Sequence, residues 1–573
     1  MDLNKIRHSL AHILAHAIQD LYPGTKFGIG PVIENGFYYD LDLPKSLIPE
    51  DLLKIEKRMR ELIKQNIIFK KNLISKDSAK KIFKNQPYKL ELLKEFYSGH
   101  RAPDKVSVYV SGEFTDFCKG NHINSTKEIP LDAFKLTKVA GAYWRGSEKN
   151  PMLTRIYGIA FSSKKELSEY LNLEAEAEKR DHRKLGEKLD LFSFQEIAPG
   201  AAFWHPKGMI IVKELEKWWR KKHEDSGYLE TSTPIMVKKS LFEKSGHWEH
   251  YRKNIFTLEI EGETYALKPM NCPESTYIYS SRIRSYKDLP LKFSEIGRLF
   301  RNELSGTISG LFRVHQLTMD DAHIYLRENQ IQSETKNLLK LVKDFYRMFG
   351  FKPEFKLATR PEDFMGSISL WKKAEKSLSL ALKQSKIKYE LKSKDGAFYG
   401  PKIDIYTKDS LKRSWQLATI QLDFQLPERF NLHYIDEKGK KRRPVIIHRA
   451  IFGSFERFIG VLLEHLAGSL PFWLAPEQIW IIPIAKRHQQ YAKKIHLELK
   501  NHNLRIKIKS DQETVSKKIR EGEIQKIPYL LVVGDEEIKN NGVRIRSKNK
   551  DLGLMNLGNF LEELKKIDKN IKE

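Results

Sequence analysis

The sequence predicts an α/β protein built from several domains. Its 573 residues are enough for about four domains of average size. Hydrophobic residues make up 40% of the chain and aromatic residues 11%, which excludes a disordered or fibrous protein because this much apolar material fills real cores. Helical and strand-like segments alternate, and changes in their rhythm divide the chain into three domains and a linker.

The first domain is expected to span residues 1–163. Apolar residues recur at helical spacing from Ile6 to Ala17, and this helix is expected to end near Pro23. The segment GIGPVIENGFYYD indicates strand and turn, residues 50–85 are charged and predicted to be helical, and residues 106–145 alternate like strands. A charged helix over residues 164–188, polar on most faces, is predicted to connect this domain to the next.

A second domain is expected over residues 189–474 and a third over residues 475–573. The second opens with a helix that has apolar residues at Ile211, Leu215 and Trp218, and strands then alternate with loops around a helical insert at 329–349. In the third, short apolar strands such as IWIIPI and YLLVVG alternate with helices. That alternation predicts a compact α/β domain with a mixed or parallel sheet.

The charge of the chain favours a polyanionic partner. Lys and Arg number 101 against 74 Asp and Glu, a formal net charge of +27, which points to nucleic acid or to scattered solvated charge. The sequence has no run of ~20 apolar residues and its start does not look like an export signal. Two cysteines cannot build a disulfide framework, so we expect a cytoplasmic protein that does not enter a membrane.

Two sets of His and Cys residues are candidate sites. His8 and His12 share a helix face, and Cys118 and His122 repeat their spacing, so the four suit either tetrahedral zinc or a polar grip on a substrate. HSLAH lacks the Glu of HExxH, which excludes a metalloprotease. Cys272 and two distant histidines would form a three-ligand zinc site with an open fourth position; the histidines are His323 and His448.

Several motifs resemble the class II aminoacyl-tRNA synthetases. FRNE, followed by the Arg of GLFRVHQ, resembles their second signature motif, GSFERFIG the third, and GYLETSTPIM with Pro234 the first. With HSLAH, GFYYD, KPMNCP, DDAHI, GAFYGPK, QLDF and IHRAI, the order resembles the threonyl-tRNA synthetase family over essentially the whole chain. The resemblance implies an N-terminal α+β editing domain, a class II core with helices flanking an antiparallel sheet, and a C-terminal α/β anticodon-binding domain.

The resemblance implies ATP-dependent attachment of L-threonine to tRNA(Thr) through threonyl-adenylate, with Mg²⁺ accompanying ATP. Arginine suits such a site because it binds phosphate in a bidentate manner. By resemblance, Arg301 holds the α-phosphate and the threonine carboxylate, Glu303 the adenine, Arg457 the γ-phosphate, and Arg313 lies on the triphosphate side. Further residues that match catalytic or substrate-binding positions are Lys402, Tyr399, Gln416, Gln421, Met270 and Ser454.

A zinc ion that binds the threonine hydroxyl would allow the enzyme to reject valine. An apolar pocket alone discriminates between these isosteric amino acids by only about 10²-fold. The resemblance implies one Zn²⁺ per subunit on Cys272, His323 and His448, with Asp321 receiving the hydroxyl hydrogen of threonine. Serine keeps the hydroxyl, so a second, hydrolytic site is needed to cleave Ser-tRNA(Thr). The residues implied for this editing site, which we expect to work without metal, are His8, His12, Cys118, His122, Lys89, Asp116 and Tyr39.

The resemblance also implies RNA contacts and a homodimer. Arg544 and Arg546 match an Arg-x-Arg that reads anticodon bases by stacking and edge hydrogen bonds, while nearby lysines contact phosphate. The first motif packs across the two-fold axis in class II enzymes, so it implies a homodimer.

The chain departs from the family at several places. It starts almost on HSLAH, so we expect a short form without the family's small N-terminal domain, either a natural one or a trimmed chain. Leu317 replaces an adenine-stacking Phe, and three further differences are Met319, Ala418 and Asn121, the last at a position that is usually Pro. Two other functions stay open: an RNA-binding regulator that has lost charging, and a protein that only deacylates mischarged tRNA. The presence of Arg301, Arg457 and the second Cys-His set speaks against both.

Overall fold

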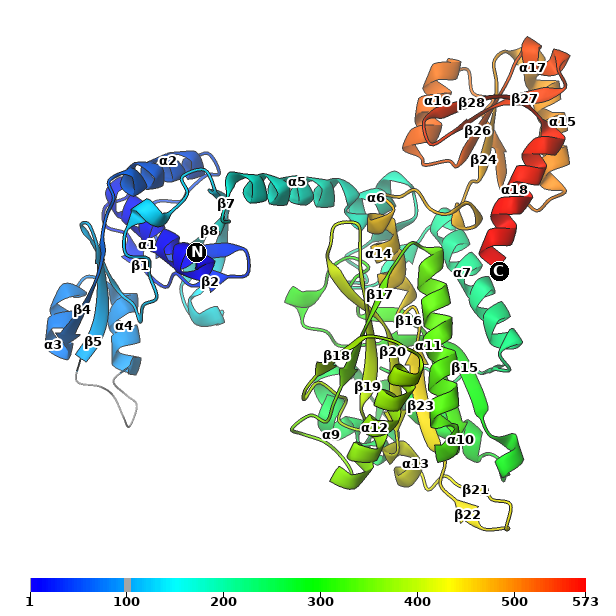
Figure 1. Cartoon of the computed structure of the whole chain (residues 1–573), viewed down its shortest axis with the longest axis horizontal. Helices are drawn as coiled ribbons and strands as arrows, with labels where there is room; N and C mark the ends of the chain where they lie inside the picture. Colours follow the sequence, from blue (N-terminus) through cyan, green and yellow to red (C-terminus); the bar gives the residue numbers. More distant parts are fainter. Residues whose placement is uncertain (1, 97–104, 573) are drawn as a thin grey trace. The chain divides into compact units, whose positions relative to one another are not determined.

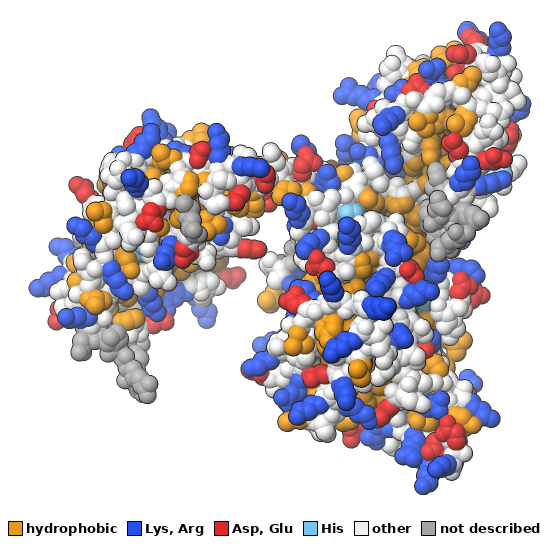
Figure 2. All heavy atoms as spheres, viewed as in Figure 1, with side chains coloured by type: hydrophobic (Ala, Val, Ile, Leu, Met, Phe, Trp, Pro, Cys, Tyr) orange, Lys and Arg blue, Asp and Glu red, His pale blue; other side chains and the backbone are white. Residues whose placement is uncertain are grey.

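The computed structural model describes residues 2–96 and 105–572 (Figure 1). The chain divides into two compact units, Met1–Ala175 and Glu176–Glu573. In the described part of the chain, no helix combines the length and the apolar character needed to cross a membrane. Lys and Arg side chains are spread over the visible face of the molecule with acidic side chains among them (Figure 2), so charge does not single out one binding patch on that face.

Helix α1 (Leu3–Leu21) forms the centre of the first unit. Its N-cap Asp2 accepts hydrogen bonds from the backbone of Asn4 and Lys5, and nearly all side chains from Ile6 to Ile18 are buried. The helix contacts α2 (Asp51–Lys64) and an antiparallel sheet. The strands of this sheet are β1 (Lys26–Phe27), β3 (Gly36–Asp42), β8 (Met152–Ala160) and β7 (Phe134–Tyr143), with β2 (Val32–Ile33) paired to β3.

A smaller antiparallel sheet completes the first unit. Its strands are β4 (Phe69–Ser75), β5 (Lys105–Ser111) and β6 (Phe114–Phe117), and the nearby helices are α3 (Lys76–Ile82) and α4 (Pro87–Phe96). The prediction of helix throughout residues 50–85 is therefore wrong over β4. This strand pairs with β5 along its whole length, and such cross-strand pairing overrides a composition that favours helix.

The segment predicted as one connecting helix is two helices, α5 (Lys164–Arg180) and α6 (His182–Lys188). Asp181 interrupts them with a non-helical backbone, and its carboxylate accepts the Arg183 N–H at 2.8 Å as the N-cap of α6. Helix α5 buries only Leu167, as its polar composition predicts. Helix α6 instead buries His182, Leu185 and Gly186, so it belongs to the core of the second unit.

An eight-stranded sheet carries the second unit. In spatial order its strands are β11 (Leu229–Glu230), β15 (Leu291–Phe300), β16 (Gln316–Leu326), β23 (Val445–Ala450), β20 (Ser414–Asp423), β19 (Lys402–Lys408), β17 (Pro353–Ala358) and β18 (Tyr389–Lys392). Only the outermost pairs, β11 with β15 and β17 with β18, are parallel. The predicted antiparallel core with flanking helices is confirmed.

Helices pack on this sheet and enclose the largest apolar cluster. The flanking helices are α7 (Pro206–Asp225), α11 (Ile331–Met348), α12 (Ile368–Gln384) and α14 (Phe455–His465), and α11 runs alongside the strands in Figure 1. The helical insert predicted at 329–349 is α11. Smaller elements are β9 (Phe192–Phe194), β10 (Ala202–Trp204), β12 (Met236–Lys238), α8 (Lys239–Ser245), α9 (His247–Tyr251), β13 (Thr257–Ile260), β14 (Glu263–Leu267), α10 (Cys272–Ser280), α13 (Gln425–Arg429), β21 (Tyr434–Ile435) and β22 (Lys441–Arg442).

The C-terminal part has a mixed sheet, as predicted. Its strands in order are β25 (Ile506–Ile508), β24 (Ile479–Pro483), β26 (Tyr529–Val533), β27 (Gly542–Ser547) and β28 (Lys550–Asn556). The first two pairs are parallel and the last two antiparallel. The helices of this part are α15 (Gln489–Lys500), α16 (Val515–Ile524), α17 (Asp535–Lys539) and α18 (Leu557–Lys572).

Candidate functional site

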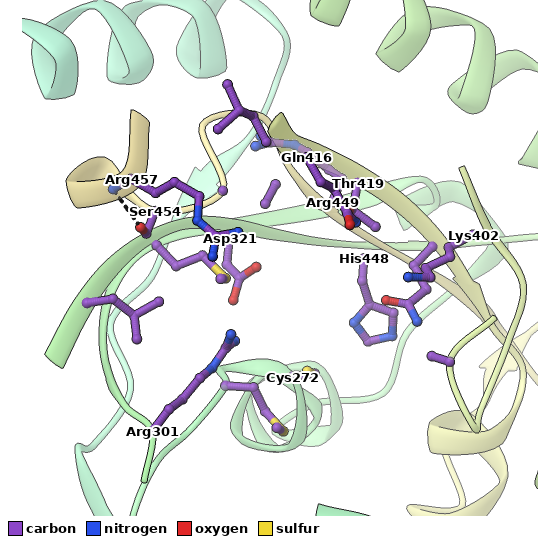
Figure 3. Close-up of a pocket in the computed structure, with 18 of the residues that line it drawn as sticks. Cys272, Arg301, Asp321, Lys402, Gln416, Thr419, His448, Arg449, Ser454 and Arg457 are labelled. Atoms are coloured by element: carbon purple, nitrogen blue, oxygen red, sulfur yellow. Dashed lines mark hydrogen bonds between the residues drawn. The ribbon is translucent and has the colours of Figure 1, made fainter. Parts of the chain in front are cut away.

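A cavity of about 530 Å³ lies over the central strands of the eight-stranded sheet (Figure 3). Strand β16 shows how the sequence builds its floor, because side chains alternate between the two faces of a strand. Leu317, Met319, Asp321 and His323 line the cavity, whereas Ala322, Ile324 and Leu326 join the apolar core. All residues predicted for threonine and ATP line this cavity: Arg301, Glu303, Arg313, Arg457, Ser454, Asp321, Lys402, Tyr399, Gln416, Gln421, Met270, Cys272, His323 and His448.

Cys272, His323 and His448 meet at one end of the cavity. His323 on β16 is the direct cross-strand partner of His448 on β23, and Cys272 is the first residue of α10. Possible ligand atoms of the three residues lie within 4.8 Å of one another. Burial lowers the pKa of His323 well below its usual range, so this imidazole is neutral, as a metal ligand must be.

The hydrogen bond of His448 tests whether these residues fit a metal. His448 Nε2 lies 2.9 Å from Asp423 Oδ2; with the proton on Nε2, the lone pair is on Nδ1, which is buried and without a partner. A carboxylate that orients a ligating imidazole in this way is typical of zinc sites. One thiol and two imidazoles therefore fit zinc, with a fourth position facing the cavity.

Sequence reasoning missed two side chains that orient this site. Asp423 orients His448, and Asn271, fully buried, donates from Nδ2 to Asp321 Oδ2 at 2.8 Å. Both lie inside motifs that carry the resemblance, QLDF and KPMNCP. The motifs therefore point to both residues, but only the structure shows which side chains they hydrogen-bond.

Three arginines converge on the other side of the cavity. Arg301 follows β15, donates from Nε to the Pro269 carbonyl at 3.2 Å, and points toward Asp321 in Figure 3. Arg457, in the first turn of α14, donates from Nε to the Phe312 carbonyl at 2.8 Å. Burial, and the nearby charges of Arg301 and Arg313, lower the pKa of Arg457. Cations held this close to one another favour a polyanionic ligand such as triphosphate.

The remaining predicted residues form a polar wall. Tyr399 donates its hydroxyl to Gln421 at 3.1 Å. Lys402 pairs with Asp404 at 3.0 Å, and Gln416 donates to the same carboxylate at 2.7 Å. Arg313 pairs with Glu303 at 2.9 Å. These contacts orient groups that a nucleotide and an amino acid need, and they leave the cavity itself open.

Three of the departures from the family lie in this part of the chain, and their surroundings differ. Leu317 is buried in a small apolar cluster with Leu299 and Val314 and lines the cavity. Met319 packs beside it. Ala418 belongs to the main core and does not line the cavity, where its neighbour Leu417 does.

The residues predicted for editing meet in the first unit. His8 Nε2 and His122 Nε2 each lie 3.4 Å from Cys118 Sγ, and the possible ligand atoms of these three and His12 lie within 4.8 Å of one another. The rings of His8 and His122 stack with centroids 4.2 Å apart. Ser9, which sequence reasoning missed, lies with its hydroxyl 3.2 Å from His122 Nδ1.

A buried ion pair forms the base of this second site. Asp116 accepts the Tyr39 hydroxyl at 2.5 Å and pairs with Lys89, while Lys89 also donates to the Tyr39 oxygen at 3.0 Å. His12 Nε2 lies 3.7 Å from the same carboxylate. All four side chains are almost fully buried, so the carboxylate has its compensating cation and donors in place.

The histidines of this site predict an acid-sensitive first unit. Burial, and the neighbouring His12 and His8, lower the pKa of His122 to about 2. Below the ordinary His pKa of about 6.5, the residue therefore takes up a proton in the unfolded chain but not in the folded chain. The free energy of unfolding then decreases by up to ~1.4 kcal/mol for each pH unit by which the pH is lowered. We expect calorimetry to show that the unfolding temperature of wild type decreases as the pH is lowered from about 7 to about 5. The decrease should be smaller in His122→Asn. The exposed His502→Asn should keep the wild-type slope.

The backbone conformation of Asn121 explains why this chain lacks the Pro that is usual in the family at this position. Its φ is +76°, directly after Gly120 at +106°, and proline cannot adopt a positive φ. Asn121→Pro is expected to lower stability by more than ~1 kcal/mol and to slow hydrolysis of Ser-tRNA, because the loop carries Cys118 and His122. Asn121→Gly is the matched control and should keep both, measured by thermal unfolding and deacylation. Wild-type behaviour of Asn121→Pro would refute this account of the loop.

Arg544 and Arg546 lie on the outward face of β27. They alternate with the buried Val543 and Ile545, as a half-buried strand requires. Arg544 pairs with Asp551 at 2.9 Å, and Arg546 lies 3.7 Å from Glu523. Both guanidinium groups are therefore held near acidic side chains on one face of the C-terminal sheet.

Three family models match this chain. They are the tRNA synthetase class II core domain (G, H, P, S and T) at residues 256–466, the anticodon binding domain at residues 478–567, and the threonyl and alanyl tRNA synthetase second additional domain at residues 106–157. A crystal structure of the RNA binding domain of threonyl-tRNA synthetase from Cryptosporidium parvum aligns with a TM-score of 0.65 and 39% identity, covering 68% of this chain and 98% of that one.

Curated relatives match over almost the whole chain. The threonine--tRNA ligase of Carboxydothermus hydrogenoformans is 49% identical over 561 residues, which covers 97% of this chain and 88% of that protein. The threonine--tRNA ligase of Clostridium tetani is 46% identical over 572 residues, 99% of this chain and 89% of that protein. The chain therefore belongs to the threonyl-tRNA synthetase family of class II aminoacyl-tRNA synthetases.

Proposed function

We propose that this chain attaches L-threonine to tRNA(Thr) through threonyl-adenylate and hydrolyses Ser-tRNA(Thr) at its second site. The observation that carries the proposal is the single cavity in which the Cys272, His323 and His448 group faces the three arginines. One end suits an amino acid with a hydroxyl, and the other suits a triphosphate. Membership of the threonyl-tRNA synthetase family supports the same pairing of substrates.

Threonine is proposed to lie between the Cys-His group and Asp321. Zn²⁺ held by Cys272, His323 and His448 would supply a Lewis acid for the amino and hydroxyl groups of threonine. Asn271 holds Asp321 by its amide, which leaves the other carboxylate oxygen to accept the hydroxyl hydrogen. Valine lacks this oxygen, so the buried polar groups would stay unpaired and reject it.

ATP is proposed to lie along the arginine side, with Mg²⁺ on its phosphates. Arg301 binds the α-phosphate and the threonine carboxylate, which places the nucleophile beside the phosphorus it attacks. Arg457 and Arg313 hold the outer phosphates, and Glu303 the adenine. Lys402 and the Tyr399, Gln416 and Gln421 wall complete the amino-acid pocket.

Editing is proposed to proceed without metal. Burial raises the pKa of Cys118 to about 11 and lowers that of His122 to about 2, so the group is neutral at physiological pH and offers hydrogen bonds. His8 and His12 would position water against the ester, and the Lys89, Asp116 and Tyr39 cluster would hold the pocket. The domain boundaries proposed for this function are 1–163, 164–188, 189–474 and 475–573.

The anticodon is proposed to bind at the C-terminal sheet. We propose that Arg544 and Arg546 leave their acidic partners to read anticodon bases.

We also propose a homodimer, because large apolar side chains of the first motif stay exposed in the single chain: Leu229 at 56%, Ile235 at 42% and Met236 at 46%. The proposed location is the cytoplasm, where bacterial relatives would meet tRNA. Sedimentation of wild type and Met236→Arg tests the dimer.

The function is tested by three assays on the purified full chain. Threonine-dependent ATP–pyrophosphate exchange, threonylation of tRNA(Thr), and hydrolysis of Ser-tRNA(Thr) should all be positive, and valine should not support exchange. RNA binding without exchange would favour the regulator. Hydrolysis without exchange would favour the deacylase. Either result would refute the proposed synthetic activity.

A further inference from the structure

His182 is buried at the start of α6, outside the cavity, and contacts two elements far apart in sequence. Its side chain is 2% exposed. The ring nitrogen Nε2 accepts the Leu311 backbone N–H at 2.9 Å, and Nδ1 lies 2.6 Å from Glu464 Oε1. Because a backbone amide only donates, Nε2 is unprotonated and Nδ1–H donates to the carboxylate. The imidazole thus bridges the turn at Leu311 and helix α14.

Asp181, His182 and Glu464 lie close enough to hold a metal ion, but their atoms are committed elsewhere. Both ring nitrogens of His182 are in use. Glu464 Oε2 accepts a hydrogen bond from Arg413 Nη2 at 2.5 Å, and Asp181 forms a bidentate pair with Arg183 through Oδ1 and Oδ2. The cluster therefore serves as a hydrogen-bonded joint.

Both elements that His182 bridges carry a phosphate-side arginine. Leu311 precedes Phe312 and Arg313, and α14 carries Arg457 in its first turn. The Phe312 ring lies between the rings of His182 and Trp415, with centroids 4.1 Å and 4.3 Å away. The Phe312 carbonyl in turn accepts Arg457 Nε at 2.8 Å. Gly310 packs so closely that a Cβ there would lie 2.2 Å from His182 Nε2.

We infer that His182 is a positioning residue for ATP: it holds the Leu311–Arg313 turn against α14, so that Arg313 and Arg457 keep their relative placement. The inference rests on the proposed function for the identity of the ligand. It differs from a general packing role because the two nitrogens have separate tasks. Nε2 orients the turn that leads to Arg313, and Nδ1–H ties the ring to the distal end of the helix that carries Arg457.

The test separates these tasks with two amide variants of the full chain. The side chain of His182→Gln can still accept the Leu311 N–H. The shorter side chain of His182→Asn keeps a donor near Glu464 but leaves the Leu311 N–H buried without a partner. A lost hydrogen bond of this kind is worth about 10-fold in binding. We expect His182→Asn to raise KM and Kd for ATP about 10-fold and leave KM for threonine within about 2-fold. His182→Gln should stay near wild type, because it keeps the bond to the turn and its backbone N–H still donates to Glu464 Oε1 at 2.9 Å.

Gly310→Ala gives a second route to the same result, because at φ +47° an added Cβ strains the turn and would lie 2.2 Å from His182 Nε2, so the turn and the ring must move apart. It should show the ATP defect of His182→Asn even where that variant folds poorly. Equal losses for ATP and threonine that follow thermal stability, or unchanged ATP binding in both variants, would overturn the inference. Direct ATP binding is measured without threonine, so a wild type that binds ATP but shows no exchange refutes only the proposed function. A wild type that does not bind ATP overturns the inference.

Discussion

Cys272→Ser is expected to remove the proposed zinc ion and threonine-dependent ATP–pyrophosphate exchange together. A serine hydroxyl is a poor substitute for a thiolate, and the two remaining imidazoles cannot hold the ion in a fixed geometry. The lost Lewis acid should lower kcat/KM for threonine by roughly 10³-fold. The measurement is metal content by mass spectrometry beside exchange rates, with about one zinc per wild-type chain.

The chain offers a matched control, since it has only two cysteines and the other lies in the first unit. Cys118→Ser should keep the zinc and the exchange, and slow only hydrolysis of Ser-tRNA. If zinc instead persists in Cys272→Ser and disappears in Cys118→Ser, the metal belongs to the His8, His12, Cys118 and His122 group. That outcome would contradict both the zinc assignment and the metal-free account of editing.

Arg301→Ala is expected to lower exchange by about 10²- to 10³-fold, the usual result of removing one donor from a developing oxyanion. Arg301 contacts the Pro269 carbonyl by Nε, which leaves its terminal nitrogens for phosphate and carboxylate. The main effect should be on kcat, because the charge that Arg301 is proposed to stabilise develops in the transition state. Steady-state exchange kinetics with ATP and threonine varied separately measure this.

Arg298→Ala is the control for charge. Arg298 is an exposed residue of β15, the strand that ends just before Arg301, so the variant loses an equal charge outside the cavity. It should keep exchange within about 2-fold, since surface charges contribute little. Equal losses in both variants would mean that Arg301 acts only through the overall field of the protein.

Much of the site could be predicted from motifs, whereas its supporting contacts could not. Arg301, Asp321 and Arg457 are recognisable because their neighbours in sequence form signature patterns. The hydrogen bond from His448 to Asp423 joins strands β23 and β20, and that from Asn271 to Asp321 spans 50 residues. Such contacts depend on strand order and register, which no local pattern encodes.

The same division holds for the fold. Helix α1 and the apolar strands β24 and β26 follow from periodicity and composition, because each buries a pattern that is written within a few turns or a single strand. Strand β4 and the break at Asp181 do not. Residues 69–75 are a strand because β5 pairs with them. His182 leaves the predicted connecting helix because its ring accepts a hydrogen bond from Leu311, 129 residues away, and donates one to Glu464, 282 residues away. Local periodicity thus specified elements and motifs, while long-range pairing and burial chose between helix and strand and gave His182 its place.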